Sequence, residues 1–384
     1  AVTLAGSFSD DWFGLPFSCK HLLRHFLPDV RLVWVQTIGL RSPEMSLYDL
    51  RRTAAKLLRW ASPARVTRGS SLANLNIIDP IQIPYGHLGA VRAINQAIMI
   101  RTLHSRVPLP AGRRRVFFTT WPFLPRLVGK IGDSLSVYYR VDDFAEFPGV
   151  KRDYIQRVER ELIQKVDIVV ATAEKLIPAG QPPQKARYLP HGVDFEHFSK
   201  PGWSLGLQSP LSRITRPRIG FFGLLSSWID LDLISSLAAR RPNWQFVLIG
   251  PSQLPVASQP RGPNIHYLGP MTYEELPVHA GEFDVGLIPF KINALTQAVN
   301  PLKLLEYFSI GFPVVSSPLP EVMKYADHLL VAEGAGGFEA AIATALATDN
   351  PQQRMARRRI AEENSWARRA GTLRGWIEEA LALE

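Results

Sequence analysis

A lysine and a glutamate lie one helical turn apart in the segment NPLKLLEY, residues 300–307. The segment predicts a helix over residues 301–310, with Asn300 as N-cap, Pro301 at the first helical position and Gly311 just past the end. A cation in the first turn opposes the helix dipole, so we expect an anion beside Lys303. A diphosphate would accept the free backbone N–H groups and the ammonium, while Glu306 would accept hydrogen bonds from a vicinal diol such as ribose. The alternative is an exposed, weak Lys303–Glu306 pair.

A glycine that follows a predicted strand marks a second candidate anion site. Residues 218–222 predict a strand that runs into Gly223, and Ser227 with Asp230 has capping-box spacing for a helix over residues 227–240. Glycine lets a phosphate or sugar approach the backbone, and Ser226 or Ser227 could donate a hydroxyl. Glycine after a strand equally serves helix–sheet packing, so the segment alone is weak evidence.

Two adjacent acids end the strand-like segment VYYRVDDF, residues 137–144. Successive strand side chains point to opposite faces, so one acid can enter a site while the other caps or braces the loop. An ionised carboxylate there could take the proton from an attacking hydroxyl, which is worth roughly 10²–10⁴ in rate. The alternative is that Asp142 and Asp143 form a turn and pair with Arg140.

The elements that must position these residues alternate between short β-branched or aromatic runs and helical periods, which is typical of parallel sheets covered by helices. The predicted strands comprise residues 2–5, 31–36, 115–119, 135–141, 168–171, 187–189, 218–222, 245–249, 265–267, 285–288, 314–316 and 329–331. The other predicted helices are 273–280, 338–347 and at least two within 351–383. Residues 199–217, rich in Ser, Pro and Gly, separate the two series.

The sequence therefore predicts an α/β protein of two doubly wound, Rossmann-like domains that face each other across a cleft. We expect an N-terminal acceptor-binding domain over residues 1–198, a linker over 199–217 and a C-terminal nucleotide-sugar-binding domain over 218–363. The last helix, residues 364–384, is expected to pack back on the first domain. Ligands of open α/β sheets bind at the carboxyl ends of the strands, so the three segments above should lie in the cleft.

The net charge of +10 is concentrated in the first half of the 384 residues. Residues 1–200 contain 28 Lys and Arg against 17 Asp and Glu, whereas residues 201–384 contain 16 against 17. Residues 51–130 contain 14 basic residues and one acid, Asp79. Such a field favours an anionic membrane surface at about 1 kcal/mol per basic residue. A solvated basic face is the alternative, and no nucleic-acid motif is present.

Composition excludes several other classes of protein. A hydrophobic content of 46% and a charged content of 20% are typical of globular domains rather than disordered chains. The single cysteine, Cys19, excludes an internal disulfide and a thiolate metal site, and it indicates a reducing compartment. No apolar run reaches the roughly 20 residues of a membrane span, and residues 1–11 lack the pattern of a secretion signal. Ala1 is not an initiator methionine, which leaves room for residues before it.

The chain resembles nucleotide-sugar-dependent glycosyltransferases of the GT-B fold, especially bacterial enzymes that build exopolysaccharides or cell-wall polymers. The resemblance runs through most of the sequence and is carried by the segments SDDWFGLPFS (residues 9–18), LPHGVD (189–194) and NPLKLLEY followed by GFPVV (300–315). It implies a donor, preferably a UDP-sugar, seated on the second domain with Lys303 near the diphosphate and Glu306 on the ribose. The expected donor-binding residues are Asn300, Pro301, Leu302, Lys303, Glu306, Gly223, Ser226 and Ser227; the expected acceptor or cleft residues are Asp11, Trp12, Gly14 and Arg140.

Residues 139–143 are similar to the segment with the catalytic aspartate in the inverting glucuronosyltransferase of xanthan synthesis. That similarity selects Asp143 as the base, with Asp142 second. Many retaining members have a glutamate where this chain has Ala298, and a basic residue after Gly223 that this chain lacks. Both differences favour inversion, without an obligatory metal or other cofactor, because Lys303 and two helix N-termini would stabilise the leaving diphosphate.

The resemblance also implies an acceptor, often a lipid-linked saccharide, bound by the first domain. We expect a cytoplasmic protein that docks peripherally on the inner leaflet through residues 51–130, and that binds no nucleic acid. Two other functions stay open. A nucleotide-sugar epimerase would convert the donor with no acceptor present, and a non-catalytic membrane-surface adaptor would not bind nucleotides.

Overall fold

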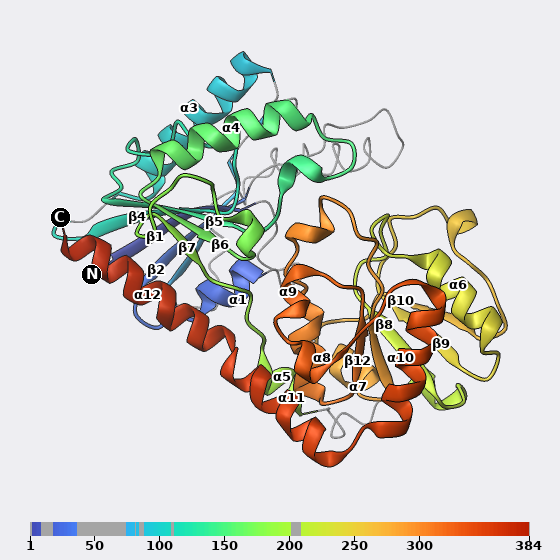
Figure 1. Cartoon of the computed structure of the whole chain (residues 1–384). Helices are drawn as coiled ribbons and strands as arrows, with labels where there is room; N and C mark the ends of the chain where they lie inside the picture. Colours follow the sequence, from blue (N-terminus) through green and yellow to red (C-terminus); the bar gives the residue numbers. More distant parts are fainter. Residues whose placement is uncertain are drawn as a thin grey trace. The chain divides into compact units, whose positions relative to one another are not determined.

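The computed structural model describes residues 2–8, 18–36, 74–80, 82–83, 88–108, 111–200 and 209–383. The chain divides into two compact units (Figure 1). The first unit comprises Ala1–Leu189 and Ala370–Glu384, and the second comprises Pro190–Arg369. Among the described residues, no helix combines the length and the hydropathy needed to cross a membrane.

The first unit is built on a parallel sheet with the strand order β3-β2-β1-β4-β5-β6-β7. Because β2 lies on one side of β1 and β4 on the other, the strand order reverses between β1 and β4. The strands are β1 (Val2–Phe8), β2 (Arg31–Gln36), β3 (Leu75–Ile78), β4 (Arg114–Thr119), β5 (Leu135–Arg140), β6 (Ile168–Ala171) and β7 (Ala186–Tyr188). The central runs are buried on both faces, as parallel strands require. The edge strand β3 was not predicted.

Helices cover the first sheet, and the C-terminal helix joins them. They are α1 (Ser18–Arg24), α3 (Gly89–Arg106), η2 (Phe144–Glu146), α4 (Arg152–Lys165), η3 (Glu174–Leu176) and α12 (Trp366–Ala382). The second half of α12 packs within this unit, where Arg187 pairs with Glu379 at 2.9 Å and Arg374 pairs with Asp29 at 3.0 Å. Residues 120–134 between β4 and β5 form turns rather than a helix.

The second unit has a parallel sheet with the order β10-β9-β8-β11-β12-β13. Its strands are β8 (Arg218–Phe222), β9 (Gln245–Ile249), β10 (Ile265–Gly269), β11 (Val285–Ile288), β12 (Val314–Ser316) and β13 (Leu330–Val331). The order reverses between β8 and β11. In open α/β sheets, that reversal is where ligands bind, beyond the carboxyl ends of the strands.

Eleven further helices belong wholly to the second unit within the described residues. They are α5 (Phe195–Ser199), η4 (Pro210–Arg213), α6 (Leu231–Arg240), η5 (Val256–Ser258), α7 (Leu276–Ala280), η6 (Thr296–Ala298), α8 (Leu302–Ile310), α9 (Pro320–Met323), η7 (Ala326–His328), α10 (Gly334–Thr348) and α11 (Pro351–Glu363), of which the α helices of more than five residues are α6, α8, α10 and α11. One continuous apolar core lies between them and the sheet.

The carboxyl end of α8 is held by arginines of α11. Gly311 ends the helix with a φ of 106°, as predicted from its position. The Arg357 guanidinium donates to the Gly311 carbonyl at 2.8 and 3.1 Å and also binds Asp349, and both side chains are buried. Arg358 donates to the carbonyls of Ile310 and Ser199. These cations satisfy the end of the helix that carries Lys303 and Glu306.

Candidate functional site

A tyrosine bridges the two strands at which the second sheet reverses its order. Strands β8 and β11 pair as far as Gly220 and Gly286. Beyond that point the Tyr307 hydroxyl accepts a hydrogen bond from the Phe222 N–H and donates one to the Leu287 carbonyl, each at 3.2 Å. The ring is fully buried. Because Tyr307 lies on α8, this bridge ties the helix to the carboxyl ends of both strands and sets the position of Lys303 one turn earlier.

The loops that follow β8 and β9 approach each other through glycines. Gly223 and Gly250 have φ angles of 133° and 140°, which residues with a Cβ atom rarely adopt. A Cβ on Gly250 would lie 2.0 Å from the Gly223 carbonyl oxygen. A Cβ on Gly223 would lie 3.6 Å from Lys303 Nζ. The lysine ammonium therefore lies against a bare stretch of backbone, at the point where the sequence predicted an anion site.

The Lys303 side chain is half-buried between two aromatic rings. Its Nζ lies 5.2 Å from the ring centroid of Phe221 and 4.8 Å from that of Phe290, close enough for cation–π attraction. Burial lowers the pKa of Lys303 to about 8, against the opposing effect of Glu306. Burial likewise raises the pKa of Glu306 to about 7, against the opposing effect of Lys303. An anion at this position would favour the charged lysine and replace the water that burial removes.

The start of α8 differs by one residue from the prediction. The helix begins at Leu302, and Pro301, with a ψ of 110°, occupies the N-cap position. Asn300 is therefore not the N-cap, because the extended conformation of Pro301 lies between it and the helix. No side chain caps this end. The first backbone N–H groups of α8 thus remain available to an anion beside Lys303.

The loop after β8 differs more from its prediction. Helix α6 begins at Leu231 rather than Ser227, and its N-cap is Asp230, whose carboxylate accepts the Leu233 N–H at 2.9 Å. The buried Ser226 hydroxyl donates to Gln253 Oε1 at 3.0 Å, whereas Ser227 is exposed. The predicted second helix N-terminus is therefore already capped. The prediction was wrong because Asp230, which was expected to be the N3 acid of a capping box begun by Ser227, is itself the N-cap.

The two acids after β5 have different surroundings. Asp143 accepts the Ala145 N–H at 3.3 Å and so caps the short helix η2. Among the residues that the structure describes, Asp142 makes no hydrogen bond through its carboxylate. Burial raises the pKa of Asp142 to about 7, and the adjacent Asp143 adds to the increase. One acid therefore braces the loop, as expected, and the other is left as a carboxyl group that gains or loses a proton near neutral pH.

Arg140, which was predicted to lie at the acceptor site, takes part in a hydrogen-bond network with α4 and the loop after β6. Its Nε and Nη2 donate to the Glu159 carboxylate at 2.9 and 2.7 Å, and its Nη1 donates to the Leu176 carbonyl at 2.7 Å. The Tyr138 hydroxyl donates to the same carboxylate at 2.6 Å. Tyr138 and Arg140 share one face of β5 because strand side chains alternate, and that face packs on α4. Each of the three guanidinium nitrogens thus already donates to a protein acceptor.

The remaining predicted site residues have no described position. Asp11, Trp12 and Gly14, expected to line the acceptor site, lie outside the described residues. Conversely, Tyr307 and Gly250 were missed by sequence reasoning. Tyr307 occupies the same helical face as Lys303, four residues on, which was the available signal. For Gly250, the signal was a glycine directly after a predicted strand, as at Gly223.

Comparison with known proteins bears on the second unit and on part of the first. Residues 216–348 match the family described as Glycosyl transferases group 1. Over 237 residues the chain is 29% identical to TuaH of Bacillus subtilis (strain 168), whose name assigns it to teichuronic acid biosynthesis as a glycosyltransferase. The alignment covers 56% of this chain and 58% of TuaH, so it spans less than two thirds of that relative.

Solved structures extend the similarity to both units. HepE of Anabaena, in complex with UDP and glucose, superposes with a TM-score of 0.65 at 12% identity, covering 98% of this chain and 99% of that one. An E. coli trehalose-6-phosphate protein bound with UDP-2-fluoro glucose gives 0.67 at 11% identity, with coverage of 98% and 99%. The trehalose 6-phosphate synthase of Burkholderia multivorans gives 0.67 at 12%, with coverage of 100% and 99%. At sequence identities this low, the structural similarity establishes a shared fold and nothing further.

Proposed function

We propose that the chain transfers a sugar from a nucleotide diphosphate donor to an acceptor hydroxyl, because it has the GT-B fold and its residues 216–348 match the family described as Glycosyl transferases group 1. One observation carries the proposal. Lys303 lies against the bare backbone of Gly223 beside the uncapped start of α8, where the strand order of the sheet reverses. A pyrophosphate there would accept from Lys303 and from the free N–H groups together.

The donor is proposed to be a UDP-sugar. Support comes from the two similar structures that contain UDP or a UDP-sugar derivative. Glu306 would accept hydrogen bonds from the ribose diol, one helical turn from the diphosphate. Its raised pKa fits this role, because a diol donates to the carboxylate and would favour the ionised form.

For the transfer step, we propose Asp142 as the base, with Asp143 bracing its loop. This reverses the order that the family similarity suggests, and it rests on the hydrogen bond of Asp143 and the raised pKa of Asp142. The acceptor oxygen attacks the anomeric carbon while the bond from that carbon to the diphosphate oxygen breaks. Asp142 takes the acceptor proton, and Lys303 stabilises the leaving diphosphate. A single displacement of this kind inverts the configuration at the anomeric carbon, and these groups supply its charge stabilisation without requiring a metal.

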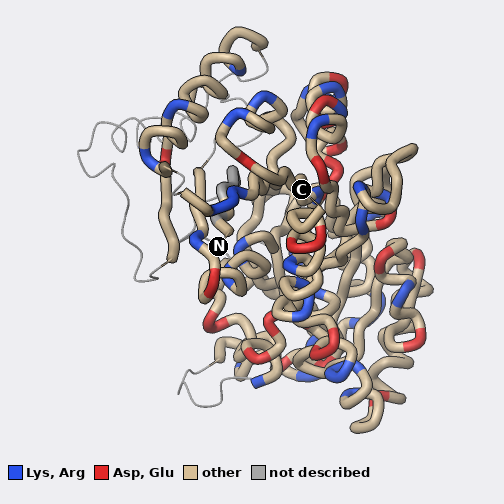
Figure 2. The backbone as a smooth tube through the Cα atoms, turned by 90° about the vertical axis from the view of Figure 1, so that its left-hand side faces the viewer, with Lys and Arg blue, Asp and Glu red and all other residues tan. Residues whose placement is uncertain are grey.

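We further propose that the acceptor is a lipid-linked saccharide of bacterial polysaccharide assembly, and that the first unit docks on the cytoplasmic leaflet. The support is the excess of basic residues, part of which lies outside the described residues. Helix α3 contains Arg92, Arg101 and Arg106 and no acidic residue (Figure 2). Because the attraction is electrostatic, protein pelleted with anionic vesicles should be released at raised salt. Retention that ignores salt would contradict this docking.

The donor proposal is tested by thermal shift across nucleoside diphosphates and their sugars. We expect UDP and a UDP-sugar to raise Tm, and Lys303→Ala to weaken their affinity roughly tenfold to 100-fold, since a charge-assisted contact is worth about 1.5–3 kcal/mol. Lys291→Ala is the matched control, because it removes an exposed lysine from the same unit. Equal losses in both variants, or no response to any nucleotide, would overturn the donor site. Donor consumption in the absence of acceptor would indicate an epimerase instead.

A further inference from the structure

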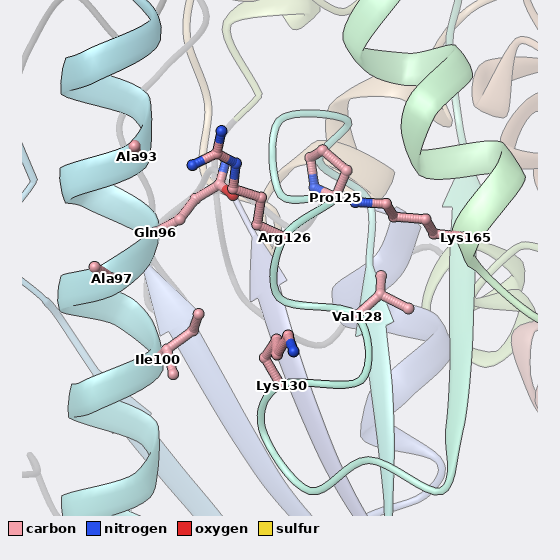
Figure 3. Close-up of a pocket in the computed structure, with 9 residues that line it drawn as sticks. All are labelled: Ala93, Gln96, Ala97, Ile100, Pro125, Arg126, Val128, Lys130 and Lys165. Carbon is pink, nitrogen blue, oxygen red and sulfur yellow. The ribbon is translucent and has the colours of Figure 1, made fainter.

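A groove opens on the first unit where the connection between β4 and β5 lacks a helix. Residues 120–134 form turns that lie between α3 and α4 (Figure 3), and these turns fill less space than a helix would. The result is a cavity of about 640 Å³, within the range of small-molecule sites. Figure 3 shows Gln96 and Ile100 extending from α3 toward this loop, while Lys165 reaches toward Pro125 from α4.

The groove combines an apolar wall with a cationic rim. Ala93, Ala97 and Ile100 recur at helical spacing and line the groove from one face of α3. Pro125 and Val128 add apolar atoms from the loop. Three cations, Arg126, Lys130 and Lys165, complete the lining, and no acidic residue is among the lining residues. All three cations are exposed. Lys165 also pairs with Glu161 at 3.0 Å, a surface pair that would compete weakly with an anion.

A buried amide oxygen in the groove lacks a partner. Gln96 is 1% exposed and lines the cavity. Its Nε2 donates to the Phe123 carbonyl at 2.7 Å, which fixes the orientation of the amide. Its Oε1 has no hydrogen-bond partner. An unsatisfied buried acceptor is costly, so a hydroxyl of a bound molecule would stabilise this position.

We propose that this groove binds an anionic phospholipid with a hydroxylated head group. The phosphate would lie against Arg126, Lys130 and Lys165, a head-group hydroxyl would donate to Gln96, and the acyl chain would cover the apolar face of α3. The proposal deepens the proposed membrane docking of the first unit and rests on it for its setting. Binding itself needs neither sugar donor nor catalysis.

The chemistry of the lining favours a lipid over other anions. A free phosphate would satisfy the three cations but would leave the apolar wall in water. Single-stranded nucleic acid binds through stacked aromatic side chains, and none of the lining residues is aromatic. A phospholipid uses both parts of the groove at once. The same reasoning predicts that neither the head group alone nor a zwitterionic lipid binds comparably.

The experiment measures binding of monomeric dihexanoyl phosphatidylglycerol to the full chain by calorimetry, below its micelle concentration. Dihexanoyl phosphatidylcholine and glycerol 3-phosphate are the comparison ligands. We expect Arg126→Glu with Lys130→Glu to weaken phosphatidylglycerol binding roughly tenfold or more, because two charge-assisted contacts are lost. Ala97→Trp should weaken it by filling the groove. Arg160→Glu with Arg113→Glu and Ser105→Trp are the matched controls. The first pair reverses two exposed charges elsewhere on this unit, and Ser105 lies exposed on α3 and is not among the lining residues.

Each other outcome contradicts the proposal. Equal binding of glycerol 3-phosphate would reduce the groove to a phosphate site. Equal binding of phosphatidylcholine would remove the role of charge, and equal losses in the control variants would indicate general surface attraction. No binding of phosphatidylglycerol by a chain that responds to UDP would overturn the groove and leave the transferase proposal intact. If both groove variants still pelleted with anionic vesicles and were still released by salt, the docking would be assigned to other basic residues.

Discussion

The start of α8 and the acid loop after β5 each contain two ionisable side chains in half-buried positions, and the two pairs differ in sign. Burial raises the pKa of Glu306 and that of Asp142 to about 7. In α8 the neighbouring cation Lys303 opposes that increase, whereas beside Asp142 the like charge of Asp143 adds to it. A pair of opposite sign suits the holding of a ligand. A pair of like sign suits the uptake of a proton.

The two regions also differ in how firmly they are held. Helix α8 is tied to β8 and β11 by Tyr307 and is capped at its carboxyl end by Arg357. The acid loop is held at Asp143, which accepts the Ala145 N–H at 3.3 Å and the Glu146 N–H at 3.0 Å. The Thr172 hydroxyl also donates to the Val141 carbonyl at 3.0 Å, and Phe144 packs in the core of the first unit. Helix α8 thus gains its geometry from long-range contacts, whereas the acid pair combines hydrogen bonds within its own loop with one from Thr172.

The sharpest test of this comparison is to neutralise each acid in turn. Asp142→Asn should lower kcat by roughly 10²–10⁴, because the acceptor loses its base, while the UDP-induced thermal shift is retained. Asp143→Asn should lower kcat by less, since an amide oxygen can still accept the Ala145 N–H. Steady-state kinetics of both variants decide the order. A larger loss in Asp143→Asn would return the role of base to Asp143.

The anchoring of α8 is tested at its carboxyl end. Arg357→Met should lower the free energy of unfolding by about 2–4 kcal/mol, because Asp349 loses a buried partner and the Gly311 carbonyl loses two hydrogen bonds. Arg354→Met is the control, since Arg354 pairs with the same carboxylate from a position that is 60% exposed and should matter by about 1 kcal/mol or less. Urea denaturation measures both. Similar values for the two variants would remove the special role of Arg357.

The bridge between the diverging strands predicts a smaller effect. Tyr307→Phe should cost about 1–3 kcal/mol of stability, because the Phe222 N–H and the Leu287 carbonyl lose their shared partner. It should also weaken UDP binding, because the helix that positions Lys303 loses its tie. Tyr267→Phe removes a hydroxyl that bonds the Pro260 carbonyl in the same unit and should leave UDP affinity unchanged. Unchanged UDP affinity in both would limit Tyr307 to a role in stability.

The smallest expected effect is a pH dependence of stability. The folded state raises the pKa of Asp142 from 3.8 to about 7, so between these values it holds a proton that the unfolded state releases. The contribution of Asp142 to the free energy of unfolding therefore declines as the pH rises from about 4 to about 7, and it is lowest above pH 7. Asp142→Asn lacks this dependence, so its stability relative to the wild type should increase from pH 4 to pH 8, by about 1 kcal/mol for a half-exposed group. Denaturation curves with a pH-independent difference would contradict the raised pKa.

Local patterns predicted the elements that carry the site, within limits set by their range. The i,i+3 spacing of Lys303 and Glu306, the left-handed Gly311 and the acids directly after a strand are short-range features, and the structure retains them. The starts of α6 and α8 were misplaced because Asp230 and Pro301 occupy the capping positions that the pattern gave to Ser227 and Asn300. Whether a residue caps a helix depends on its own φ and ψ, which neighbouring loops influence.

Partners distant in sequence could not be predicted in the same way. Arg140 had nearby acids at Asp142 and Asp143, yet it pairs with Glu159 on α4, because the pleat of β5 directs it there. The close approach of Gly250 to Gly223 likewise follows from the pairing of β9 beside β8. In both cases the competing local partner was plausible, and only the packing of two elements decided between them.

The sequence by itself determined the α/β alternation, the charge asymmetry between the halves and the presence of a cation with an anion on one helical turn, because each depends on residue type and spacing alone. The tertiary structure decided which of two adjacent aspartates braces its loop, which lysine lies against bare backbone and where a missing helix leaves a groove. Those outcomes depend on burial and on contacts across the fold, since desolvation and hydrogen bonding act through space rather than along the chain.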